Sequence, residues 1–186
     1  MKLAVRPLRI PDLKLITGAR VADQRGYFAE TYVRRDFAAA GLDYDFVQDN
    51  QSGSQAAGTV RGLHFQSPPF AQAKLIRVLK GRIFDACLDL RRGSPTYGQH
   101  ASIELNSTSG HQLLIPQGFA HGFCTLEPDT EVLYKVTNVY APEHDRGIYW
   151  NDPALGIAWP AMASERNVSE KDRSLPKHAD LPAYFE

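Results

Sequence analysis

Short segments in which apolar and polar residues alternate make up most of the chain, separated by Gly, Pro, Asn and Asp. The clearest is Phe84–Leu90, where Phe84, Ala86, Leu88 and Leu90 fall on one face. Alternation with a period of two is typical of a half-buried β-strand. We expect further strands at Tyr27–Val33, Phe46–Asn50, Thr59–Phe65, Lys74–Leu79, Ala101–Leu105, Gln112–Ile115, Gly118–Leu126 and Glu131–Val139.

Helical patterns are few. Asp36–Gly41 and Ser169–Arg173 each predict a short helix, and Lys80-Gly81 predicts a tight hairpin between its two flanking strands. More than eight short strands predict an all-β sandwich or barrel, with a jelly roll favoured. Because no repeat or linker divides the sequence, we expect one domain over residues 1–186.

Composition narrows the class of protein. Of the 186 residues 43% are apolar, enough for a core without disulfide or metal support. The 21 basic and 21 acidic residues balance, which argues against nucleic-acid or membrane partners but permits a small anionic ligand. Cys87 and Cys124 form no disulfide framework. With no signal-like or membrane-spanning apolar run, we expect a cytoplasmic protein.

The densest cluster of reactive residue types is Arg61–Gln66, followed by Lys74. Strand parity puts His64 and Gln66 on one face, opposite Leu63 and Phe65. If that face lines the interior, His64 is a sheltered imidazole suited to proton transfer. The alternative is an ordinary surface or hydrogen-bonded histidine, which the segment alone favours.

A second segment, Pro116–Phe123, predicts a sharp turn that delivers His121 onto a strand and resembles the PxGxxH motif of cupins. Metal-binding cupins also carry an HxH pair, but here the first segment reads His64-Phe65-Gln66. Two histidines fall short of the three or more ligands of a usual transition-metal site, so we expect no metal. Tyr134, on a half-buried strand, is either a proton donor or a packing residue.

Other enzyme classes have weaker support. Asp85 and Asp89 lie about 13 Å apart along a strand, too far to act as a glycosidase pair. The sequence has no GxSxG elbow and no glycine-rich phosphate loop, so anions would be bound by side chains such as Arg25, Arg61 and Lys74.

Taken together, the motifs resemble the dTDP-4-dehydrorhamnose 3,5-epimerase family. The resemblance runs in order through Asp23–Glu30, Gln48–Ser52, Arg61–Gln66, Ala73-Lys74, Asp89–Arg91, Ser94–Gly98, Pro116–Phe123, Tyr140–Glu143, Trp150–Pro153, Trp159-Pro160 and Ser169–Asp172. It covers almost the whole chain and is more specific than any single motif.

The resemblance implies a cupin-like jelly roll, a homodimer, no cofactor, and a dTDP-4-keto-6-deoxyglucose substrate inverted at C3 and C5. It further implies that His64 is the general base, Asp172 its carboxylate partner and Tyr134 the proton donor. Lys74 and His121 match positions beside the sugar and its C4 oxygen. The remaining nucleotide- or sugar-contacting matches are Arg25, Glu30, Gln48, Asn50, Arg61, Tyr140, Glu143 and Lys171, of which Arg25 and Glu30 are candidates to reach a neighbouring subunit's site.

Two departures from the family pattern leave alternatives open. Gly53 stands where a larger residue is common, and Asn138-Val139 precedes Tyr140 where aromatic or acidic residues are frequent. Both positions bear on how the sugar is held. The alternatives are a monoepimerase or ketoisomerase acting on a related dTDP-4-keto sugar, a metal-dependent cupin enzyme, and a non-catalytic sugar-nucleotide binding protein.

Overall fold

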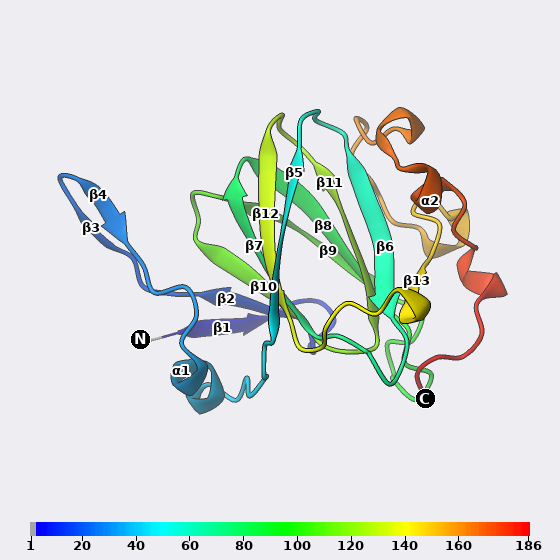
Figure 1. Ribbon diagram of the computed structural model, residues 1–186, viewed down its shortest axis with the longest axis horizontal. Helices are drawn as coiled ribbons and strands as arrows, with labels where there is room; N and C mark the ends of the chain where they lie inside the picture. The colour runs from blue at the N-terminus through cyan, green and yellow to red at the C-terminus, as the bar shows by residue number, and fades with distance from the viewer. Residues whose placement is uncertain (1–2) are drawn as a thin grey trace.

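The computed structural model describes residues 3–186 and shows two antiparallel β-sheets packed face to face (Figure 1). One has six strands, in the order β1 (Ala4–Pro7), β2 (Lys14–Thr17), β10 (His111–Ile115), β7 (Lys74–Lys80), β12 (Thr130–Val136) and β5 (Gln48–Ser54). The other has five, in the order β13 (Asp145–Gly147), β6 (Val60–Gln66), β11 (Phe119–Thr125), β8 (Arg82–Asp89) and β9 (His100–Asn106).

The main core fills the space between the sheets. Its side chains come from both inner faces, including Ile76, Val78 and Val132 on the six-stranded sheet and Cys87 and Phe123 on the five-stranded one. Burial of this apolar surface is the main favourable contribution to folding. The cupin-like, all-β prediction with a few short helices is therefore confirmed.

Further clusters cover the outer faces. Phe37 on α1 (Arg34–Ala39) packs against Ile16 and Leu114 on the outside of the six-stranded sheet. Over the five-stranded sheet, the C-terminal segment packs onto Phe65, whose ring lies 5.4 Å from that of Tyr184. The short helices of this segment are η1 (Pro142–His144), η2 (Pro153–Leu155), η3 (Glu165–Asn167), α2 (Glu170–Arg173) and η4 (His178–Asp180).

A hairpin of β3 (Val21–Asp23) and β4 (Gly26–Phe28) projects from one side of the molecule, while α2 lies on the opposite side (Figure 1). The expected strand Tyr27–Val33 is thus wrong beyond Phe28. Tyr32 leaves the strand pattern because its ring packs against Phe37 and Phe46, at centroid distances of 4.9 and 5.3 Å.

The predicted hairpin at Lys80-Gly81 is also wrong. β7 and β8 lie in different sheets, so the turn carries the chain from one sheet to the other. Gly81 has a φ of +79°, and a Cβ there would lie 2.4 Å from Thr130 Oγ1. A glycine therefore permits both the left-handed backbone and the close approach to β12 that this crossing needs.

The strand expected over Glu131–Val139 ends at Val136. Beyond it, Asn138 leaves the sheet and its side-chain amide donates to the carbonyl of Ala71, 3.1 Å away. Residues 3–186 contain no helix both long and apolar enough to cross a bilayer.

Candidate active site

Two connected hollows open between the sheets. The larger, of about 500 Å³, is lined by Ser52, Thr59, Val60, Arg61, His64, Lys74, His121, Phe123, Tyr134, Asn167, Val168, Ser169, Lys171 and Asp172. The smaller, of about 260 Å³, is lined by Gln48, Asn50, His64, Phe65, Gln66, Gln72, Lys74, Tyr134, Tyr140, Asp145 and Lys171. The shared residues His64, Lys74, Tyr134 and Lys171 mark where the hollows meet, and we call the whole space the cleft.

His64 faces the cleft from the middle of β6, whose other face carries Leu63 and Phe65 into the outer cluster, as strand parity predicts. Its Nε2 lies 2.7 Å from Asp172 Oδ1. The His64 side chain is 31% exposed and that of Asp172 only 5%, so the imidazole reaches the cleft while its partner is shielded. The carboxylate can hold the ring in one tautomer and stabilise its protonated form.

Asp172 is held on three sides. Ser169 caps α2 by accepting from the Asp172 N–H at 3.1 Å, and the second carboxylate oxygen accepts from the Gly62 N–H at 3.2 Å. Burial raises the pKa of Asp172, but its hydrogen bonds to His64, Gly62 and Ser169 more than offset this, so the net shift is downward. Asp172 therefore stays ionised beside the imidazole.

Lys74 and His121 approach the cleft from the two sheets. The Lys74 ammonium donates to the backbone oxygen of His64 at 3.3 Å, and burial lowers its pKa to about 8 although the negative charges of Asp145 and Asp85 oppose the shift. His121 Nε2 lies 2.8 Å from Asp85 Oδ2, and the Asp85 side chain is fully buried. These two side chains can place hydrogen-bond donors at a developing oxyanion.

Tyr134 projects from β12 into both hollows and is partly exposed. Burial raises the pKa of its phenol, with the nearby Arg61 opposing the shift. The group is therefore protonated at neutral pH and can donate a proton, the first of the two roles left open by the sequence, although its ring also packs against the main core.

Five other predicted contact residues surround the cleft. The Arg61 guanidinium donates to Ser54 Oγ at 3.2 Å and to the Gly53 carbonyl at 2.9 Å. In the smaller hollow, the Gln48 side chain donates to Asn50 Oδ1 at 2.8 Å and accepts from the Tyr140 N–H at 3.0 Å. Lys171 contacts Asp145, as described below.

Three predicted residues do not line the cleft. Arg25 sits at the hairpin tip, 84% exposed and paired with Asp23. Glu30 lines a separate small hollow with Arg20 and Arg77. The structure thus leaves their contact roles, and that of exposed Glu143, as predictions.

Sequence reasoning missed Asp85 and Asp145. The sequence draws attention to Asp85 only as a possible partner of Asp89, although Asp85 lies on the same strand face as Cys87, whose side chain is in the main core. The alternation therefore indicates that the Asp85 carboxylate points inward. Its pairing with His121 cannot be seen in the sequence, because it depends on β8 and β11 being neighbours in the sheet. Within residues 3–186 no group of three or more His, Cys, Asp or Glu is arranged to hold a metal ion.

Known proteins resemble almost the whole chain. A family model described as dTDP-4-dehydrorhamnose 3,5-epimerase matches residues 7–180. A relative of that name from Sinorhizobium fredii is 51% identical over 179 residues, 96% of this chain and 91% of the relative.

Solved structures agree. The Bacillus anthracis dTDP-4-dehydrorhamnose 3,5-epimerase with TDP and PPi bound has a TM-score of 0.91 and 46% identity, covering 95% of this chain and 99% of that one. A Legionella pneumophila dTDP-6-deoxy-D-glucose-3,5-epimerase in complex with dTDP-4-keto-L-rhamnose also has a TM-score of 0.91, with 37% identity and coverage of 98% and 96%. This chain belongs to the dTDP-4-dehydrorhamnose 3,5-epimerase family.

Proposed function

We propose that this chain is an isomerase that converts dTDP-4-keto-6-deoxyglucose to dTDP-4-keto-rhamnose by inverting C3 and C5. The observation that carries the proposal is the His64–Asp172 pair at 2.7 Å, open to a cleft that Lys74 and Tyr134 also line. A Legionella pneumophila relative was crystallised with dTDP-4-keto-L-rhamnose, the product expected here.

The base works on both carbons. The protons on C3 and C5 are each α to the C4 ketone, so the same carbonyl acidifies both. His64 removes one proton at a time, and Asp172 stabilises the imidazolium that results. Each abstraction places negative charge on the C4 oxygen as an enolate.

Lys74 and His121 stabilise that enolate by hydrogen bonds from the two sheets. Inversion then requires a proton from the face of the ring opposite His64. Tyr134 supplies it, since its phenol keeps its proton at neutral pH. The steps as proposed use only side chains of the protein and no cofactor.

The rest of the cleft would hold the nucleotide. We assign contacts with the dTDP half to Gln48, Asn50, Arg61, Tyr140 and Lys171. Arg25, at the projecting hairpin, and Glu30 would reach the neighbouring subunit's site in a homodimer, and Glu143 would be a further substrate contact. The cytoplasmic location and the single domain over residues 1–186 stay predictions from the sequence.

The test is incubation with dTDP-4-keto-6-deoxyglucose in heavy water, with NMR and mass analysis of the sugar and trapping of the product by a reductase. Deuterium at both C3 and C5, with a rhamnose-configured product, supports the proposal. Deuterium at one carbon would instead identify a monoepimerase. Failure of exchange at both carbons, with the nucleotide bound, would overturn the role of His64. His64→Ala should abolish exchange while leaving nucleotide affinity unchanged, and a chelator tests the metal-dependent alternative.

A further inference from the structure

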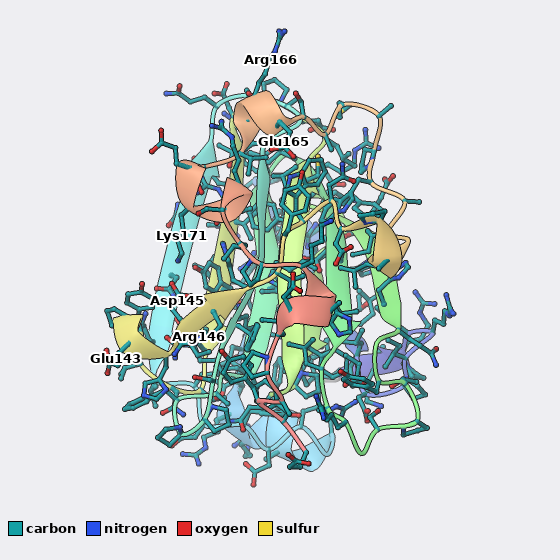
Figure 2. The ribbon with its side chains drawn as sticks, turned by 90° about the vertical axis from the view of Figure 1, so that its right-hand side faces the viewer. Glu143, Asp145, Arg146, Glu165, Arg166 and Lys171 are labelled. Atoms are coloured by element: carbon teal, nitrogen blue, oxygen red, sulfur yellow. The ribbon has the colours of Figure 1, made fainter. Side chains whose placement is uncertain are left out.

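A carboxylate lies inside the cleft where an anionic substrate is expected. Asp145, at the start of β13, forms an ion pair through Oδ2 with Lys171 on α2, and the same oxygen accepts from the Tyr140 hydroxyl at 3.1 Å. The Asp145 side chain is 14% exposed and that of Lys171 56%. Figure 2 shows the two residues on the same side of the molecule, near the start of β13.

The negative charge of Asp145 affects two side chains of the cleft, Lys74 and Tyr134. Asp145 is among the groups that raise the pKa of both Lys74 and Tyr134. Its neighbour Arg146 does not neutralise it, because the Arg146 guanidinium donates to Tyr184 Oη and to a backbone carbonyl. An unpaired carboxylate here would repel a diphosphate.

The two basic groups of the outer cleft differ in their partners. Arg61 donates to a hydroxyl and a backbone carbonyl, both neutral, so a phosphate can approach it without displacing an anion. Lys171 already carries an anionic partner. A diphosphate that binds Lys171 must therefore compete with Asp145 or share the lysine with it.

We propose that Asp145 is the resident counter-ion of Lys171 and that the diphosphate of the substrate displaces it. The inference rests on the function proposed above and makes Asp145 a positioning residue. Its ion pair holds Lys171, and with it the adjacent Asp172, against the sheet that carries His64. On binding, Lys171 exchanges the carboxylate for the diphosphate.

Displacement of Asp145 by the diphosphate predicts the direction in which a substitution changes the Kd for dTDP. Asp145→Asn removes the competing charge, yet its side-chain oxygen can still accept from Tyr140. We expect the Kd for dTDP to fall roughly three- to tenfold, as charges several ångströms apart in a partly solvated cleft imply. KM should fall with it, and any change in kcat should follow the lower pKa of Lys74 and appear in the pH–rate profile.

The measurement is calorimetric titration of the full chain with dTDP at about 0.15 M salt, where longer-range charge effects are screened. The matched control is Glu170→Gln, which removes the same charge from the exposed residue just before Lys171. It should change the Kd by less than about twofold.

Weaker or unchanged dTDP binding by Asp145→Asn would overturn the inference, since it would make Asp145 a nucleotide contact or an inert residue. Thermal melting and circular dichroism establish that each variant is folded. Failure of the wild-type chain to bind dTDP would count against the proposed function instead, so the two failures are distinguishable.

Discussion

The most informative substitution is Asp172→Asn, which keeps the size of the side chain and removes its charge. In the proposed mechanism His64 takes a proton, and the imidazolium would face the Asp172 carboxylate, with 2.7 Å between Nε2 and Oδ1. With the charge centres about 4 Å apart and an effective dielectric constant of about 20, the attraction is about 4 kcal/mol. His64 is 31% exposed, so solvent screening reduces this toward about 2 kcal/mol.

That range corresponds to a fall in kcat of roughly 30- to 1000-fold. The substitution also turns one acceptor into a donor, because Oδ1 and Oδ2 serve His64 and the Gly62 N–H respectively. The amide either turns its NH2 group toward the Gly62 N–H or holds His64 in the tautomer that is protonated on Nδ1. We expect a loss of about 1 to 3 kcal/mol in the free energy of unfolding.

The assay follows deuterium exchange at C3 and C5 and product formation at saturating substrate, with dTDP affinity measured in parallel. Asp180→Asn, a similar change at an exposed site in η4, serves as the control and should leave kcat unchanged. If Asp172→Asn retains more than a third of wild-type kcat while folded, the pair does not act as the base. Because folding lowers the pKa of Asp172, its carboxylate stabilises the folded state above about pH 4, and this contribution is lost as the pH falls further. The free energy of unfolding of Asp172→Asn should lack this part of the pH dependence.

Three further results follow from the cleft. Burial lowers the pKa of Lys74 to about 8, so kcat should decline above about pH 8 as the ammonium loses its proton. The negative charge of Asp85 raises that pKa, so in a pH–rate profile of Asp85→Asn the decline should begin at lower pH. Tyr134→Phe should reduce completed inversion more than deuterium exchange, and equal losses by NMR would remove its assignment as donor. Gly122→Ala would place a Cβ 2.8 Å from the Arg61 carbonyl and should lower stability by about 1 to 3 kcal/mol in denaturant unfolding; an unchanged midpoint would show that β6 and β11 can separate freely.

The alternating pattern predicted most of the strands because successive residues of a strand point to opposite faces, and each face packs in a different environment. His64 was placed correctly by parity, since Leu63 and Phe65 pack under the C-terminal segment. The Lys80-Gly81 turn shows what such a pattern lacks. A short glycine turn joins strands equally well within a sheet or between sheets, and the choice depends on the packing of Gly81 against Thr130.

The candidate site shows a similar division. The family resemblance suggested Asp172 as the partner of His64, and the structure brings them together across 108 positions. The sequence does not identify Asp85 and Asp145 as site residues, because their cationic partners lie on another strand and on α2. A local pattern says which face a carboxylate is on, and only the tertiary fold says which cation it meets.

The separation of His64 and Asp172 in the chain has a consequence for synthesis. At roughly 5 to 20 residues per second, a ribosome makes Asp172 about 5 to 20 s after His64, since 108 positions separate them. A nascent chain can contain β6 and its imidazole before the carboxylate that activates it exists. The proposed His64–Asp172 pair can therefore form only late in synthesis, once α2 has been made and has docked on β6.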